Sequence, residues 1–270
     1  MLSIASTQYM TITMDSNPLA SCLDDPNIVI IDSREIMAYR FRHIKNAKHL
    51  GIESVISIAD NGANLVIDAP TAERLFSSVG IDGSKTVVVY GESADPSAAR
   101  IVWTLMYHGH LNVRLLDIGF NQWLQRGYPV TRQVHHCQRS NVGVTQFKSK
   151  INPTIRAEAE YIKTKQIDSN VVVLDARTPQ EHVQARIPGS ILDCWEEGIG
   201  LDGEMIKSQA QLEKDFEAQG ISKDKEVICY CHLGTRASHK YLQLKQAGFD
   251  RVRLYDGSII DWAQRRNPIR

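Results

Sequence analysis

A cysteine, a glycine and an arginine lie close together in the segment Cys231-His232-Leu233-Gly234-Thr235-Arg236, here called the cysteine loop. The loop follows an apolar run at 226–230 and precedes a helix-like segment. A short loop between a strand and a helix can turn several backbone N–H groups inward, and the helix dipole adds positive charge. A cysteine at the base of such a loop is held as a thiolate, its nucleophilic form. The segment therefore predicts thiol chemistry with Cys231 as the nucleophile.

The other residues of the cysteine loop have roles that suit this prediction. Gly234 allows a backbone conformation that most residues resist, and Arg236 adds a fixed positive charge at the helix entry. Thr235 or Ser238 could cap the helix. The alternative is that Cys231 is an inert cysteine at a strand end and Gly234 only a turn residue.

The chain has five cysteines, at positions 22, 137, 194, 229 and 231. Their odd number and irregular spacing argue against a disulfide framework. Most free cysteines are small buried apolar residues, and Cys229, two residues before Cys231 in an apolar run, fits that role. A metal site at Cys229, Cys231 and His232 lacks a second pair of ligands at suitable spacing. The sequence implies neither a metal nor an organic cofactor.

The chain repeats itself. Buried parallel strands are predicted at 87–90 and 226–230, and each is followed by a helix-like segment and a second short strand. Glycine, aspartate, tryptophan and proline then recur at the same offsets, as Gly109, Asp117, Trp123 and Pro129 and as Gly248, Asp256, Trp262 and Pro268. These four residues, repeated at fixed offsets after matching strands, indicate two copies of one domain.

The upstream halves of the copies also correspond. The apolar runs 28–31 and 171–174 each end in Asp-x-Arg, as Asp32 with Arg34 and as Asp175 with Arg177. A feature present in both copies is structural by this comparison. We therefore expect a partly buried ion pair at the end of each strand.

Alternating strands and helices predict an α/β fold with two tandem domains, each a parallel sheet with helices on both faces. The expected boundaries are 1–135 for the first domain, 136–152 for a polar surface linker and 153–270 for the second domain. Ligands of such sheets bind beyond the carboxyl ends of the strands. There the first copy has Gly91 after Tyr90, where the second has Cys231. The first domain is thus expected to be inactive and the second catalytic.

Composition excludes several classes of protein. Hydrophobic residues make up 43% of the 270, too many for a disordered chain. The 31 basic and 31 acidic residues balance, so no nucleic-acid or membrane partner is expected from bulk charge. The first residues lack a basic stretch before an apolar core, and no apolar run suits a membrane helix. We expect a cytoplasmic protein.

The cysteine loop and the duplicated Asp-x-Arg resemble the rhodanese superfamily. Residues 175–181 followed by 187–190 are similar to that family's first signature, and 201–204 with 207–208 resemble a segment of its two-domain members. The resemblance covers nearly the whole chain. In tandem rhodaneses the first domain is usually inactive and the second carries the cysteine, as here.

The resemblance implies a sulfurtransferase that needs no cofactor. Cys231 would take sulfane sulfur from thiosulfate, hold it as a persulfide and pass it to cyanide or a thiol, with ping-pong kinetics. 3-Mercaptopyruvate is the alternative donor, and relay of the sulfur to a protein partner is a further alternative. A cysteine-dependent phosphatase is a remote one, because four residues rather than five separate Cys231 from Arg236.

The loop differs from the usual tandem patterns. Leu233 stands where thiosulfate enzymes carry Lys, and Glu181 stands where both subfamilies carry a donor-binding Arg. The loop more resembles the Cys-x-x-Gly-x-Arg version of single-domain rhodaneses. Arg236 is then the main candidate for binding the anionic donor, or else pairs with a nearby carboxylate. The remaining candidates for substrate binding are His232, Leu233, Gly234, Thr235 and, more weakly, Arg186.

Overall fold

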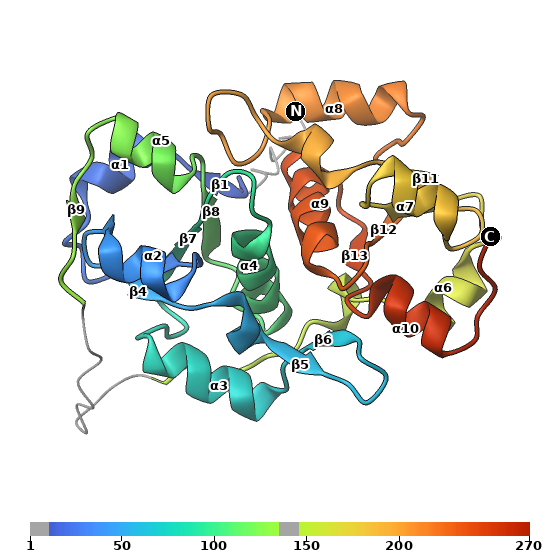
Figure 1. The fold of residues 1–270 in the computed structure, drawn as a ribbon, viewed down its shortest axis with the longest axis horizontal. Helices are drawn as coiled ribbons and strands as arrows, with labels where there is room; N and C mark the ends of the chain where they lie inside the picture. Colours follow the sequence, from blue (N-terminus) through green and yellow to red (C-terminus); the bar gives the residue numbers. More distant parts are fainter. Residues whose placement is uncertain (1–10, 135–145) are drawn as a thin grey trace, which may run out of the picture.

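Two parallel β-sheets, one in each half of the chain, organise the computed structural model, which describes residues 11–134 and 146–270. Figure 1 shows the first half, in blue to green, beside the second half, in yellow to red. Residues 136–145 of the predicted linker lie outside the described residues, and so does Cys137.

The first domain alternates strands and helices. Its elements in chain order are β1 (Thr13–Met14), α1 (Ser16–Ser21), β2 (Ile28–Asp32), α2 (Ile36–Phe41), β3 (His43–Ile44), β4 (Lys48–His49), the 3-10 helix η1 (Ile52–Val55), β5 (Ile56–Ile58), β6 (Asn64–Val66), α3 (Ala69–Ser78), β7 (Thr86–Tyr90), α4 (Ser97–Tyr107), β8 (Val113–Leu116), α5 (Phe120–Gln125) and β9 (Val130–Thr131).

The second domain follows the same plan. Its elements are the 3-10 helix η2 (Pro153–Ile155), α6 (Ala159–Lys165), β10 (Val171–Asp175), α7 (Pro179–Gln184), β11 (Ile191–Leu192), the 3-10 helix η3 (Trp195–Gly198), α8 (Gln209–Ala218), β12 (Glu226–Tyr230), α9 (Thr235–Gln246), β13 (Val252–Leu254) and α10 (Ser258–Gln264).

The main sheets of the two domains have matching registers. Within the described residues the strand orders are β1-β8-β7-β2-β4 and β11-β10-β12-β13, with every neighbouring pair parallel. Asp32 lies opposite Tyr90 in the first sheet, as Asp175 lies opposite Tyr230 in the second. The repeat in sequence is therefore also a repeat in strand register.

Helices cover both faces of each sheet, which explains why the central strands are almost continuously apolar. In the first domain α3 and α4 pack on one face, and α1 and α5 pack on the other. In the second domain α8 and α9 cover one face, and α6 and α10 cover the other. The predicted fold, two tandem α/β domains with helices on both faces, is confirmed.

The two domains share one hydrophobic core. Helix α4 packs along α9 at the centre of the molecule (Figure 1), and one cluster of buried residues runs through both helices. Each domain also contacts the loops of the other. The Met205 N–H donates to Asp117 O at 2.8 Å, and the Val66 N–H donates to Asp256 Oδ2 at 2.8 Å.

The described end of the predicted linker packs on the first domain. The Lys150 N–H donates to His108 O at 2.9 Å, the Asn152 N–H donates to Tyr107 O at 2.7 Å, and Phe147 is buried. None of the helices among the described residues is long and apolar enough to cross a bilayer.

Candidate active site

Cys231 lies at the carboxyl end of β12, directly after Tyr230. Its side chain is 1% exposed, and its Sγ accepts a hydrogen bond from the Gly234 N–H at 3.1 Å. The Cys231 N–H in turn donates to Ser258 Oγ at 3.0 Å. These two bonds fix the cysteine within the loop, and the first of them places an N–H donor on the sulfur.

Gly234 is required by both its conformation and its surroundings. Its φ is 87°, in the left-handed region that favours glycine. A Cβ at this position would lie 2.5 Å from Asp256 O and 2.8 Å from Arg100 Nη1. The loop can therefore close on the sulfur only with glycine at this position.

Helix α9 begins without a side-chain cap. Gly234 is its N-cap residue, and the Ser238 Oγ donates to Thr235 O at 2.6 Å instead of capping the helix. The prediction that Thr235 or Ser238 caps this helix is therefore wrong. The backbone N–H groups at a helix start carry partial positive charge, and here they begin beside the sulfur.

Arg236 forms a two-bond ion pair with Glu181. Its Nη1 donates to Glu181 Oε2 at 2.7 Å, and its Nη2 donates to Oε1 at 2.8 Å. These bonds lower the pKa of Glu181 to about 2 and raise the pKa of Arg236. The alternative role of Arg236, a pair with a nearby carboxylate, is thus present. Its side chain is 24% exposed, so it can still meet an incoming anion.

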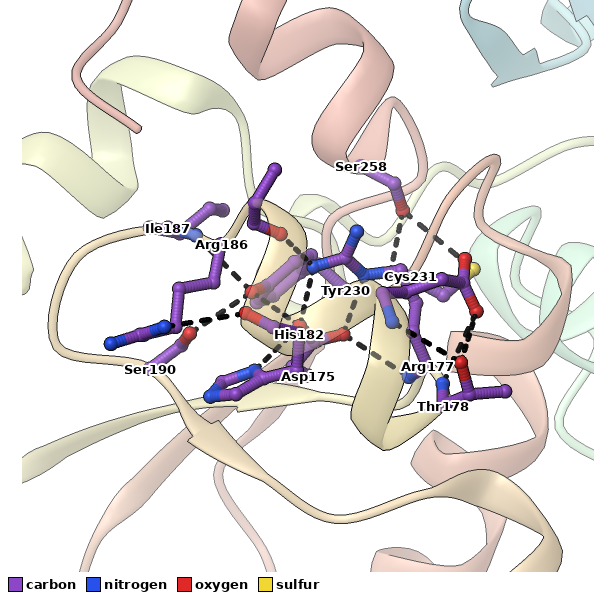
Figure 2. A network of polar contacts seen from close by, with 12 residues as sticks. Asp175, Arg177, Thr178, His182, Arg186, Ile187, Ser190, Tyr230, Cys231 and Ser258 are labelled. Carbon is purple, nitrogen blue, oxygen red and sulfur yellow. Dashed lines mark hydrogen bonds and ion pairs between the residues drawn. The ribbon is translucent and has the colours of Figure 1, made fainter. Parts of the chain in front are cut away.

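The remaining candidates differ in position. His232 is exposed, while Leu233 and Thr235 are half-buried in the same loop. Arg186 lies apart: its Nη1 donates to His182 O at 3.3 Å, and Figure 2 shows its side chain directed away from Cys231. The structure brings the loop residues together with Cys231, and does not bring Arg186 to them.

Buried ion pairs hold the ends of the central strands. Arg177 Nη2 lies 2.6 Å from Asp175 Oδ2, which also accepts from the Tyr230 hydroxyl at 2.8 Å (Figure 2). In the first domain Arg34 Nη2 lies 2.7 Å from Asp32 Oδ2. Burial raises the pKa of Tyr230, so its hydroxyl stays protonated and donates. This network fixes the backbone immediately before Cys231.

The corresponding loop of the first domain has a different structure. Gly91 takes the place of the cysteine, and a Cβ there would lie 2.7 Å from Ser33 Oγ. The Gly119 N–H beside it donates to Gly203 O of the second domain at 2.8 Å. A turn of the second domain therefore contacts Gly119, directly beside the loop that would carry the thiol.

The other described cysteines lie in different surroundings. Cys229 is completely buried, and burial raises its pKa; burial also raises the pKa of Cys194. Cys22 is half-buried on the first domain. Over residues 11–134 and 146–270, no three His, Cys, Asp or Glu side chains are grouped as a metal site requires.

Three residues of the site are not apparent from the sequence: Ser258, Asp256 and Arg100. The sequence does single out Asp256, because an aspartate recurs at the matching position of the first copy as Asp117. It does not single out Ser258 or Arg100, because their contacts depend on how the segments pack in space.

A parallel α/β domain present twice, with a cysteine at the strand end of the second copy only, defines a class of two-domain proteins suited to thiol chemistry. The Rhodanese-like domain family matches residues 16–126 and again residues 158–265. The chain therefore belongs to the rhodanese family.

Its relatives are similar over most of their length. It is 28% identical to the sulfur carrier protein TtuD of Thermus thermophilus, over 89% of each chain. It is 30% identical to putative thiosulfate sulfurtransferase 1 of Mycobacterium bovis, over 90% of this chain and 91% of that one. The crystal structure of SseA from Escherichia coli, a 3-mercaptopyruvate sulfotransferase, has the same fold, with a TM-score of 0.80 at 24% identity. That match covers 92% of this chain and 99% of SseA.

Proposed function

We propose that this protein is a sulfurtransferase that moves sulfane sulfur from thiosulfate to cyanide or a thiol through a persulfide on Cys231. The observation that carries the proposal is the N–H of Gly234, 3.1 Å from the Cys231 sulfur at the start of helix α9. This donor and the helix dipole favour an anionic sulfur, which is both the attacking thiolate and the persulfide product. The thiosulfate sulfurtransferase names of several relatives support the same reaction.

The transfer has two balanced steps. The Cys231 thiolate attacks the outer sulfur of thiosulfate, the S–S bond of the donor breaks, and sulfite leaves with its electron pair. Cyanide or a thiolate then attacks the outer sulfur of the persulfide, and the cysteine sulfur leaves as thiolate. Because the first domain has Gly91 at the matching position, we propose that it carries no sulfur itself.

Arg236 is the proposed contact for the anionic donor, together with His232, Leu233, Gly234 and Thr235 of the same loop. Its pairing with Glu181 sets a condition on this role, since the donor must share the guanidinium with a carboxylate. Arg186 would need to reorient to take part, because its guanidinium is bonded to His182 O.

Relay of sulfur to a protein partner is a second candidate. The similarity to a protein named as a sulfur carrier favours it, and so does the 1% exposure of Cys231, since a docking partner could open the loop. A phosphatase is disfavoured, because the loop holds only four residues between Cys231 and Arg236 and the arginine is already paired.

The test is the mass of the intact protein after incubation with thiosulfate or with 3-mercaptopyruvate, followed by peptide mapping. We expect a gain of one sulfur atom on Cys231 with thiosulfate, and none in Cys231→Ser. Faster loading by 3-mercaptopyruvate would reassign the donor. Loading only by a persulfidated donor protein would favour relay, and no loading by any of the three would overturn the proposal. Hydrolysis of an aryl phosphate that is lost in Cys231→Ser would support the phosphatase.

A further inference from the structure

A fully buried arginine of the first domain lies against the cysteine loop of the second. Arg100 belongs to α4, its side chain is 0% exposed, and α4 packs along α9 (Figure 1). Its Nη1 lies 2.8 Å from the point where a Cβ on Gly234 would stand. The N–H of the same glycine donates to Cys231 Sγ at 3.1 Å. The guanidinium and the sulfur therefore both contact Gly234.

The guanidinium of Arg100 is poorly satisfied. Among the residues that the structure describes, its Nε and Nη1 have no hydrogen-bond partner, although both are buried. Its Nη2 is 3.5 Å from Asn64 O and 4.0 Å from Asp256 Oδ2. That carboxylate already accepts from Arg156 Nε at 2.9 Å and from the Val66 N–H at 2.8 Å. Buried donors without acceptors are costly, and such a group in a native structure calls for an explanation such as a catalytic role or a bound ion.

The charges around Arg100 leave it as a cation available to the cysteine loop. Arg236 is matched by Glu181, and Arg156 is matched by Asp256. Burial lowers the pKa of Arg100, whereas Asp256 and a thiolate on Cys231 raise it. Guanidinium nevertheless stays protonated in proteins. Within the described part of this site, Arg100 is the cation whose charge is least matched.

The second domain does not repeat this charge. The offset that relates Gly109 to Gly248 relates Arg100 to His239. Burial lowers the pKa of His239 to about 3, so this ring is neutral, and its Nε2 lies 3.1 Å from Met205 O. The cation is therefore present only in the copy whose helix faces a thiol-bearing loop.

We propose that Arg100 stabilises the negative sulfur on Cys231. The first domain thereby supplies a positive charge to an active site whose thiol lies in the second domain. Where the inference concerns the persulfide, it rests on the proposed function, because that function forms the persulfide. Where it concerns the thiolate, it does not. The sulfur on the cysteine is anionic before the first step, as the thiolate, and again after it, as the persulfide. The donor that approaches is an anion as well.

The thiolate can be tested without turnover. The ultraviolet absorbance of the Cys231 thiolate is titrated with pH in the wild type, Arg100→Gln and Arg100→Lys, and the signal of each matching Cys231→Ser variant is subtracted. We expect the midpoint to rise by about one pH unit or more in Arg100→Gln, and lysine to restore most of the shift. Arg74→Gln is the control for loss of a first-domain arginine, because Arg74 lies in α3 with its Nη2 donating to Thr71 Oγ1 at 3.1 Å, and it should leave the midpoint unchanged.

The persulfide is tested in the same variants from the rate of sulfur loading by thiosulfate. We expect a fall of about tenfold or more in Arg100→Gln, with partial recovery when guanidinium ion is added to Arg100→Ala. Circular dichroism identifies the variants that fold, and the lysine variant and the guanidinium rescue remain informative if Arg100→Gln does not. A folded Arg100→Gln with an unchanged midpoint and loading rate overturns the inference. Wild-type protein that takes up no sulfur, but whose midpoint depends on Arg100, overturns the proposed function and leaves this inference standing.

Discussion

Glu181 and Arg236 join helices α7 and α9 through two parallel hydrogen bonds of 2.7 and 2.8 Å. The same carboxylate accepts from the Thr178 N–H at 3.2 Å and so completes the capping box at the start of α7. The Glu181 side chain therefore caps the start of α7 and also holds Arg236 of the cysteine loop in place. An anionic donor that binds Arg236 has to compete with this carboxylate.

The competition predicts opposite effects of two substitutions. Glu181→Gln should free Arg236 and lower the KM for thiosulfate about threefold, whereas Arg236→Gln should lower kcat/KM about tenfold or more. Steady-state kinetics with thiosulfate and cyanide measure both. If Glu181→Gln instead loses activity in parallel with Arg236→Gln, the pair serves to hold the loop rather than to bind the donor.

The ion pair also predicts how stability depends on pH. The pKa of Glu181 is lowered from 4.5 to about 2 in the folded protein, mainly by its hydrogen bonds with Arg236. The stabilisation is therefore fully present above pH 4.5 and is lost as the pH falls toward 2. We expect the difference in unfolding free energy between wild type and Glu181→Gln to be largest at pH 7 and to shrink between pH 4.5 and pH 3. Urea unfolding across this range measures it, and a pH-independent difference contradicts the prediction.

Gly234→Ala should destabilise the protein by roughly 3 kcal/mol or more and abolish sulfur loading, because the added Cβ meets Asp256 O at 2.5 Å. Gly220→Ala is the matched control. Its φ of 73° is also left-handed, but a Cβ there has nothing within 4 Å, so about 1 kcal/mol is expected from conformation alone. Thermal unfolding and loading assays separate the two effects. Equal losses in both variants would mean that space at Gly234 is unimportant.

If Cys231 is the single catalytic cysteine, replacing each of the five cysteines in turn has a definite expected outcome. Cys231→Ser should lose turnover completely, whereas Cys22→Ser, Cys137→Ser and Cys194→Ser should keep most of it. Cys229→Ser should remain active but lose about 1–3 kcal/mol of stability, because it places a hydroxyl in a fully buried position. Loss of turnover without unfolding in Cys22→Ser or Cys137→Ser would show that a second thiol takes part.

The fold was predictable because buried parallel strands are recognisable in a sequence as short, nearly continuous apolar runs. The apolar runs that end in Asp32 and Asp175, and the later runs that end in Tyr90 and Tyr230, are the paired central strands of the two sheets. Their near-continuous apolar character follows from having helices on both faces. Position along the chain was therefore enough to place Cys231 at a strand end.

The surroundings of Cys231 were less predictable, since they depend on contacts between distant segments. The Ser258 hydroxyl reaches the Cys231 N–H across 27 positions of sequence, and Arg100 reaches the loop from the other domain. Local patterns carry no information about such contacts. The helix cap was mispredicted for a related reason, since a left-handed Gly234 starts α9 and directs its N–H to the sulfur.

The loop around Gly91 has a consequence for how the two copies can still change. A cysteine restored at Gly91 would meet Ser33 Oγ, which donates to Tyr90 O at 2.9 Å, while Gly203 of the other copy already holds the adjacent Gly119. We therefore expect that Gly91→Cys alone does not reproduce the surroundings of Cys231, because the neighbouring segments would have to change as well. The two loops therefore differ in packing as well as in sequence, and the first one is built around contacts with Gly203 of the second domain rather than around a thiol.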